Sequence, residues 1–285
     1  MDRLQSHRDF FANLITSSAG GAAKHPRLAG AFASTPRERF VGPGPWKVYG
    51  AAGYVETPSD DPVFLYQDVT VAISSERGIN NGQPTLHAIC LAVLDIKEGE
   101  TLVHIGAGTG YYTAILAKLT GPTGSVIAYE IEKDLAERAT QNLADLPNVI
   151  LRCASGSEGQ LPECDVIYVS AGATAPLDIW LDALRMDGRL LFPLTPGDTR
   201  VGTPGAGGML LVKRAAPDRY EARFICQAIF ISCAGARDDE MAAKLATAFK
   251  RGDMKHVRSL RRNVSPDETC WCAGNGWWLS KADHR

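Results

Sequence analysis

The stretch LVHIGAGTGYY, residues 102–112, decides the expected fold. Its short apolar run predicts a buried strand, and three glycines, Gly106, Gly108 and Gly110, follow the strand at once. Glycine adopts backbone angles that other residues avoid and lets a ligand approach the main chain. A strand, a glycine loop and a helix in this order are typical of nucleotide-binding α/β folds. The spacing is G-x-G-x-G, with Tyr111 where a dinucleotide motif has its last glycine, and this disfavours NAD.

A carboxylate follows the next expected strand. The run SVIAYEI, residues 125–131, predicts that strand, and Glu130 lies near its end. A carboxylate at this place can accept hydrogen bonds from both hydroxyls of a ribose. The loop and the acid together predict a nucleoside-binding site; the alternative for Glu130 alone is a solvated charge at a strand end.

Strand-like and helix-like runs alternate around this loop. Helical periodicity is found in residues 84–96, 111–119, 133–146 and 176–184. Short β-rich runs are found in residues 101–106, 125–131, 148–154, 164–171, 188–194, 208–214 and 221–232. This alternation predicts an α/β fold with a doubly wound, mostly parallel sheet. The last two or three strands have no helix between them, so we expect them to be antiparallel.

The flanking segments differ from this core. Residues 4–15 and 27–41 predict short helices, the second broken near Pro36, and residues 42–64 predict an irregular segment. Residues 238–262 predict one helix with a basic second half. The expected organisation is an N-terminal helical and acceptor-loop segment (1–83), a cofactor-binding core (84–232) and a C-terminal helical, tryptophan-rich extension (233–285).

Composition argues against several classes of protein. The formal net charge of −2 gives no reason to expect nucleic acid or an anionic membrane as a partner. No apolar run approaches the roughly 18 residues of a membrane-spanning helix, and the charged N-terminus is unlike a secretory signal. Seven scattered cysteines favour reduced thiols and a cytoplasmic location. Only Cys270 and Cys272 lie close together, too close for the usual zinc half-site, so we expect no metal.

Several motifs in order resemble a known family. LVHIGAGTGYYTAILAKL, SVIAYEIEKDLAERA, CDVIYVSAGATAPL and LRMDGRLLFPL are similar to successive motifs of S-adenosylmethionine-dependent methyltransferases. PRERFV (36–41), YQDVTVAI (66–73), NGQPTLHA (81–88) and ARFICQAIF (222–230) narrow the resemblance to protein-L-isoaspartate O-methyltransferases, over roughly residues 28–232. The resemblance implies a Rossmann-like, seven-stranded sheet, S-adenosylmethionine as the cofactor, and esterification of isoaspartyl carboxyls in proteins or peptides, which begins their repair.

The resemblance also implies a cofactor-binding set. Its members are the loop residues Gly106, Ala107, Gly108 and Gly110, then Glu130 at the ribose with Ile131 beside it, and Ser155 and Gly156 beside the adenine. The family usually has Gly-Asp-Gly at this last place, where this chain has Ala154-Ser155-Gly156. An acidic contact to the adenine is therefore absent or replaced by a hydroxyl.

His104 belongs to the same cofactor-binding set, but it replaces an acid of the family on the strand before the loop. An imidazole can hydrogen-bond a loop amide, yet a neutral ring offers no full counter-charge. We therefore expect weaker cofactor binding. Two other interpretations stay open: a strand histidine satisfied by the backbone, and a direct role as a base.

The expected acceptor segment departs further from the family. In the family's T-I-S-x-P a serine hydroxyl lies beside the carboxylate to be methylated, and Gly82 takes that place here. Amide groups of Asn80, Asn81 and Gln83, or the N–H of Gly82, can donate instead. Asp68 matches a family aspartate near the same loop. We expect Gly82, Asn81 and Asp68 to position the acceptor; the alternative is an ordinary polar turn.

Other features bear on the alternatives. VSAGATAP, residues 169–176, lacks the (Asp/Asn)-Pro-Pro-(Tyr/Phe) motif of DNA adenine methyltransferases, which counts against a nucleic-acid substrate. The basic run at residues 250–262 is expected to be a solvated helix face rather than a phosphate-binding surface. Three tryptophans within WCAGNGWWLS, residues 271–280, either pack back onto the protein or form an interface.

The expected function is therefore methylation of isoaspartyl or related carboxylates in a protein or peptide substrate. One alternative is a variant that acts on a different peptide or small-molecule carboxylate. The other is a non-catalytic module that keeps the cofactor fold and works through its C-terminal extension. The sequence does not specify the oligomeric state.

Overall fold

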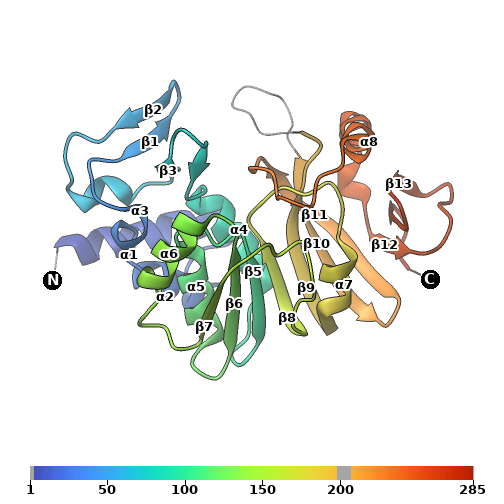
Figure 1. Cartoon of the computed structure of the whole chain (residues 1–285), viewed down its shortest axis with the longest axis horizontal. Helices are drawn as coiled ribbons and strands as arrows, with labels where there is room; N and C mark the ends of the chain where they lie inside the picture. Colours follow the sequence, from blue (N-terminus) through green and yellow to red (C-terminus); the bar gives the residue numbers. More distant parts are fainter. Residues whose placement is uncertain (1–2, 198–206, 285) are drawn as a thin grey trace. The chain divides into compact units, whose positions relative to one another are not determined.

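A computed structural model describes residues 3–197 and 207–284 of the chain. Contacts divide the chain into two units. Figure 1 labels the helices and strands along the chain. The first unit comprises residues 1–100 and 107–153, and the second comprises residues 101–106 and 154–285. No helix within the described ranges is long and apolar enough to cross a membrane.

The first unit contains most of the helices. They are α1 (Arg3–Ser17), α2 (Pro26–Ala33), α3 (Glu38–Val41), the 3₁₀ helix η1 (Pro62–Leu65), α4 (Pro84–Leu94), α5 (Tyr111–Thr120) and α6 (Lys133–Asn142). The strands are β1 (Lys47–Gly50), β2 (Gly53–Glu56), β3 (Ala72–Ser74), β4 (Ile79–Asn80), β6 (Ser125–Glu130) and β7 (Val149–Cys153). Strands β1 and β2 pair antiparallel, as do β3 and β4, whereas β6 and β7 pair in parallel.

Aromatic packing ties the N-terminal helices of this unit to α5. The rings of Phe40 and Phe32 lie 5.5 Å and 6.4 Å from that of Tyr111, the first residue of α5. Phe11 in α1 packs edge-on against Tyr66 at 5.7 Å. These side chains are nearly excluded from solvent, so the hydrophobic effect holds the helices before residue 42 against the helix that follows the glycine loop.

The second unit is built on a mixed sheet. Its strands are β5 (Thr101–Ile105), β8 (Cys164–Val169), β9 (Leu184–Leu194), β10 (Gly207–Ala216), β11 (Arg219–Ala228), β12 (Ser259–Arg262), β13 (Cys270–Ala273) and β14 (Trp277–Ser280). Their order is β13-β14-β12-β11-β10-β9-β8-β5. Strands β5, β8 and β9 are parallel, and those beyond β9 are antiparallel. The helices are α7 (Asp178–Ala183), α8 (Asp239–Lys250) and the short 3₁₀ helix η2 (Met254–His256).

The α/β fold class is confirmed, and so is the antiparallel pairing of the last core strands. The number of strands is a correction. We expected seven strands, mostly parallel, but the described part of the second unit has eight, in addition to β6 and β7 of the first. The additional strands β12–β14 come from the C-terminal extension, whose pattern we interpreted as helical.

The single helix expected over residues 238–262 is wrong, because α8 ends at Lys250. Gly252 adopts φ +74°, and a left-handed residue ends a right-handed helix. Residues 259–262 then pair with β11 and β14. The basic run is therefore not one solvated helix face: Arg262, for example, forms ion pairs with Asp178 and Asp182.

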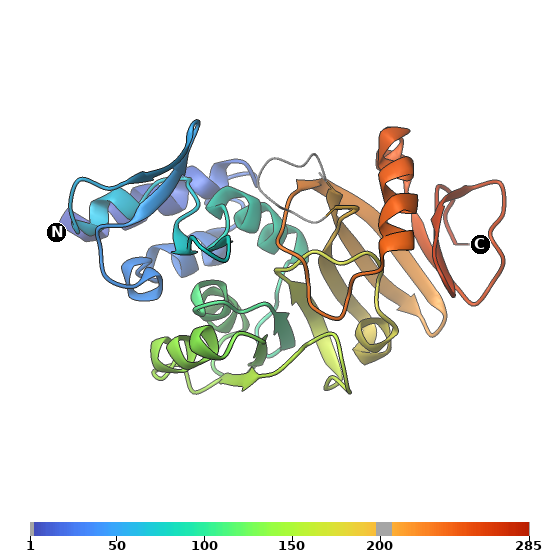
Figure 2. The ribbon, with the colours of Figure 1, turned by 45° about the horizontal axis from the view of Figure 1, so that its top comes forward.

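The tryptophan-rich end packs onto its own unit, as one of our two interpretations predicted. Trp271, Trp277 and Trp278 are 1%, 7% and 2% exposed. The Trp271 ring lies 5.2 Å from both Phe224 of β11 and Phe249 of α8. Figure 2 shows α8, in orange, beside the strands of the extension, and α8 contacts β13. Segment boundaries at residues 83 and 232 stay a prediction.

Residues 42–64 are more regular than expected. They form the β1–β2 hairpin and η1, where we predicted an irregular segment. Tyr49 pairs with Tyr54 and Val48 with Val55 across a turn, and most of these side chains are exposed. An exposed two-stranded hairpin needs no apolar alternation, which is why its sequence carried no strand signal.

Candidate active site

The glycine loop joins β5 to α5 through three left-handed residues. Gly106, Gly108 and Gly110 have φ values of +79°, +57° and +97°, a region that costs other residues about 1–2 kcal/mol. A Cβ at Gly110 would lie 2.9 Å from the Leu143 side chain, whereas one at Gly108 would meet no described atom within 4 Å. The space beside Gly108 is thus open for a ligand to approach the main chain.

Glu130 holds this loop from the end of β6. One carboxylate oxygen accepts a hydrogen bond from the Gly108 N–H at 2.6 Å, and the other accepts one from the Glu132 N–H at 2.9 Å. Burial raises the pKa of this carboxyl above its ordinary value, although the two N–H donors act in the opposite direction. Each oxygen keeps lone-pair capacity for a ribose hydroxyl. Ile131, the next residue, is 51% exposed.

His104 is buried within β5, in the second unit. Its Nε2 lies 3.1 Å from Ser170 Oγ, and its ring stacks on Tyr168 with 5.6 Å between centroids. Burial lowers its pKa to about 3, so the imidazole is neutral at physiological pH. This agrees with the expectation that position 104 supplies no counter-charge.

Ser155 and Gly156 also belong to the second unit, and both have structural partners. Ser155 Oγ accepts a hydrogen bond from the Ser157 N–H at 3.2 Å and lies 2.8 Å from the Ser157 hydroxyl. A Cβ at Gly156 would lie 2.7 Å from Ile105, and the Gly156 carbonyl accepts a hydrogen bond from the Trp180 indole at 2.8 Å. Their role toward an adenine stays a prediction.

Asp68 fixes the start of α4, in the first unit. Its carboxylate accepts a hydrogen bond from the Thr85 N–H at 2.8 Å and another from Gln83 Nε2 at 3.1 Å. The first N–H groups of a helix have no partner inside the helix, and a carboxylate there also interacts favourably with the helix dipole. Asp68 therefore positions the expected acceptor segment and occupies the Gln83 amide.

Most other amide groups of this segment are also engaged. The Gly82 N–H donates to Asn80 Oδ1 at 2.9 Å, and the Asn80 side chain hydrogen-bonds Tyr54. Asn81 Oδ1 accepts a hydrogen bond from the Val71 N–H at 2.8 Å. Asn81 Nδ2, in contrast, is buried and has no hydrogen-bond partner among the described residues. Among the amide donors that we expected, Asn81 Nδ2 is therefore the buried group that has no acceptor among the described residues.

Gly82 is required here by both backbone conformation and space. Its φ is +73°, and a Cβ at this position would lie 2.3 Å from Nε2 of His87. His87 is buried in the first turn of α4, and its ring stacks on Tyr112 with 3.5 Å between centroids and 8° between planes. The imidazole thus occupies the space that a side chain at position 82 would need.

Comparison with known protein families decides the assignment. The family model for protein-L-isoaspartate (D-aspartate) O-methyltransferase matches residues 6–201, which is more than half of the chain. The chain belongs to this family. The family predicted from the motifs is therefore confirmed, and residues 202–285, which hold β10 to β14, lie outside the match.

Curated members of the protein-L-isoaspartate O-methyltransferase family are moderately similar to the chain. The protein of Thermotoga maritima is 30% identical over 182 residues, which are 61% of this chain and 51% of that protein. The protein of Ignicoccus hospitalis is 29% identical over 194 residues, which are 67% of this chain and 82% of that protein. The chain thus spans about half the length of the Thermotoga relative and most of the Ignicoccus relative.

Solved structures of the family share the fold. A protein-L-isoaspartate O-methyltransferase has a TM-score of 0.62 at 21% identity and covers 90% of this chain and 74% of its own. A putative protein-L-isoaspartate O-methyltransferase from Plasmodium falciparum, in complex with S-adenosyl-L-homocysteine, has a TM-score of 0.57 at 18% identity. The match covers 77% of this chain and 98% of that protein. At these identities the likeness establishes the fold alone, and it confirms the Rossmann-like fold class.

Arg37 lies within one of the family motifs, but the sequence pattern did not single it out. Its guanidinium is fully buried and donates to the carbonyls of Leu65, Gln67 and Val69, the last two at 2.9 Å and 3.0 Å. It thereby holds the main chain on both sides of Asp68. A charged residue three positions before the apolar Phe40 was the available signal, but its carbonyl partners are about thirty residues away in the sequence.

Proposed function

We propose that this chain is an S-adenosylmethionine-dependent carboxyl O-methyltransferase that esterifies isoaspartyl carboxylates in proteins or peptides. The observation that carries this proposal is the Gly106–Gly110 loop, held by Glu130, in a member of this family. The open space at Gly108 and the acceptor capacity of Glu130 fit a nucleoside. When bound, the cofactor supplies an electrophilic methyl group on a sulfonium.

The proposed reaction makes few demands on the side chains. An acceptor carboxylate oxygen forms the new bond to the methyl carbon, and the sulfur–carbon bond breaks with its electron pair left on sulfur. No proton has to move, so a neutral, buried His104 is compatible with the reaction. The protein has to bind the two reactants, orient them in line and exclude water.

The acceptor residues have distinct proposed roles. Asn81 Nδ2 donates a hydrogen bond to the acceptor carboxylate, because it is the buried amide that has no partner among the described residues. Asp68 positions the segment through Thr85 and Gln83. Gly82 contributes its backbone conformation.

The wider assignments are proposals as well. The cofactor-binding set, including His104, Gly106, Ala107, Gly110, Ile131, Ser155 and Gly156, rests on the motif positions. A protein or peptide substrate rests on the family, and the absence of a nucleic-acid partner rests on the weak net charge. A cytoplasmic location is supported by the seven cysteines, all of which are free thiols.

One observation favours a second candidate function. A serine cannot occupy position 82 without displacing His87, so the place where the family has a hydroxyl is built differently. An acceptor site altered in this way suits a different peptide carboxylate, such as an aspartyl side chain or a C-terminus.

The test uses methyl-labelled S-adenosylmethionine and peptides that differ only in carrying isoaspartate, aspartate or a free C-terminal carboxylate. We expect base-labile methyl ester on the isoaspartyl peptide. Ester on another peptide instead would support the second candidate, and no ester on any peptide would contradict both. Asn81→Ala should lower kcat/KM, whereas Asn13→Ala, an exposed asparagine of α1, should not.

A further inference from the structure

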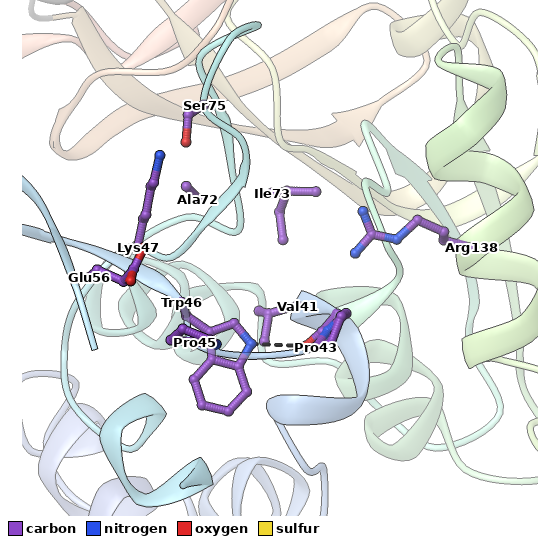
Figure 3. A pocket seen from close by; sticks show the side chains of 11 residues that line it. Val41, Pro43, Pro45, Trp46, Lys47, Glu56, Ala72, Ile73, Ser75 and Arg138 are labelled. Carbon is purple, nitrogen blue, oxygen red and sulfur yellow. Dashed lines mark hydrogen bonds between the residues drawn. The ribbon is translucent and has the colours of Figure 1, made fainter. Parts of the chain in front are cut away.

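A cavity of about 370 Å³ opens in the first unit, outside the cofactor and acceptor residues named above. Its lining comes from the loop before β1, the β1–β2 hairpin, the β3 region and α6. Val41, Trp46 and Ile73 supply apolar surface, and Trp46 is fixed by a hydrogen bond from its indole N–H to the Gly42 carbonyl at 2.8 Å. Figure 3 shows the side chains of Lys47 and Arg138 on opposite sides of this cavity.

The two cations differ in their surroundings, because Lys47 lies opposite Glu56 across the β1–β2 hairpin, whereas Arg138 lies on α6. Neither Lys47 nor Arg138 forms an ion pair with any residue in the described ranges. Other arginines of the same unit are paired: Arg39 lies 2.7 Å from Asp145, and Arg77 lies 2.6 Å from Asp134. Glu56 also lines the cavity, so its ionisable side chains carry a net charge of +1 from two cations and one anion. The cavity therefore has capacity for one further negative group.

The cavity shares a hairpin with the acceptor segment. Ala72, Ile73 and Ser75 line it, and Ala72 is the cross-strand partner of Asn80. Asn80 is followed directly by Asn81 and Gly82, and the Val71 N–H donates to Asn81 Oδ1. A peptide whose carboxylate is held at Asn81 can therefore extend along this hairpin toward the cavity.

We propose that this cavity binds an acidic side chain of the protein substrate, close in sequence to the carboxylate that is methylated. The proposal rests on the proposed function. The apolar surface contacts the methylene groups of that side chain, Arg138 binds its carboxylate through the fork of the guanidinium, and Lys47 adds to the positive potential of the cavity.

The test is a set of isoaspartyl peptides in which Glu, Gln or Lys is placed in turn at each neighbouring position. At one position Glu should raise kcat/KM over Gln by about two- to fivefold, through a lower KM, as expected for a solvent-accessible ion pair. Arg138→Gln and Lys47→Gln should each reduce this preference, and the double variant should abolish it. Lys133→Gln, an exposed cation on the same helix as Arg138, should keep it. Added salt should weaken the preference.

Equal kcat/KM for Glu and Gln peptides at every position overturns the proposal, and so does a preference that survives in the double variant. Either result leaves methylation of the peptides intact, so the proposed function stands. If no peptide is methylated, the proposed function fails, and binding of fluorescently labelled peptides, followed by anisotropy, decides the cavity proposal. Tighter binding of a Glu peptide than of the Gln peptide, with the difference lost in the double variant, supports the cavity proposal. Equal binding of the Glu and Gln peptides overturns it.

Discussion

At the scale of single residues, Gly82 departs furthest from the family pattern. A glycine in place of a serine suggests a simple loss of a hydroxyl. The structure shows that positions 82 and 87 depend on each other: Gly82 has a left-handed backbone conformation, and His87 fills the space that a side chain at position 82 would need. Restoring the serine should therefore harm the protein rather than repair it.

We predict that Gly82→Ser lowers the free energy of unfolding by about 1–3 kcal/mol, from backbone strain and the clash with His87. Gly78→Ser is the matched control. Gly78 lies in the turn between β3 and β4, just before the acceptor segment, and has a φ of +68°, but a Cβ there meets no described atom within 4 Å. In urea unfolding, Gly78→Ser should lose only the stability that corresponds to backbone strain, because it creates no side-chain clash. Equal losses in the two variants would contradict the role assigned to His87, as would failure of His87→Ala to relieve Gly82→Ser.

His104 makes a separate prediction about pH. Its pKa is about 3 in the folded chain and 6.5 in the unfolded chain, so between these values the unfolded chain binds one more proton. Stability should therefore fall as pH drops below 6.5, by up to about 1.4 kcal/mol per pH unit from this group, and should be unaffected by it above pH 7. Urea unfolding at pH 7, 6 and 5 should show a shallower decline for His104→Gln. Parallel declines for the two proteins would argue against a neutral, buried imidazole.

At the scale of elements, Arg37 joins α3 to the acceptor region. Its buried guanidinium satisfies three carbonyls around Asp68 and also lies over the Phe11 ring at 5.2 Å. Asp68 in turn holds the first turn of α4 and Gln83. The shape of the acceptor segment therefore depends on a residue that precedes it by more than forty positions.

We predict that Arg37→Met lowers the free energy of unfolding by about 2–4 kcal/mol, because it leaves buried carbonyls without donors. The same substitution should raise KM for the peptide. Arg37→Lys should rescue little, since one ammonium cannot reproduce the planar fork. Arg39→Met, which removes an exposed ion pair with Asp145, should cost less than about 1 kcal/mol. Similar losses for Arg37→Met and Arg39→Met in urea unfolding would contradict this account.

The sequence predicted the elements that have a strong hydrophobic pattern, and it failed to predict the elements that lack one. Strands β5, β6 and β8 are buried apolar runs, and their prediction is confirmed. The β1–β2 hairpin is exposed and β12–β14 are only four residues each, so neither carried a recognisable period. The loop and Glu130 followed from spacing. The stacking of His87 on Tyr112 and the carbonyl partners of Arg37 are tertiary contacts, which no local pattern encodes.

At the scale of the whole molecule, the end of the family match does not coincide with a boundary between the two units. The match ends at residue 201, within the second unit, and the antiparallel strands β10–β14 follow it. The tryptophans of the extension are buried within that unit. We therefore regard the extension as an integral part of the second unit, which weakens the alternative of a module that acts through an exposed C-terminal surface.

The central claim is that the loop held by Glu130 binds the cofactor, and calorimetric titration with S-adenosylhomocysteine tests it most directly. We predict one binding site per chain, weakened at least about tenfold in Glu130→Ala through loss of charged hydrogen bonds. Glu137→Ala, an exposed glutamate on the following helix, should bind like the wild type. Absence of binding to the wild-type chain, or equal affinity in Glu130→Ala, would contradict the account.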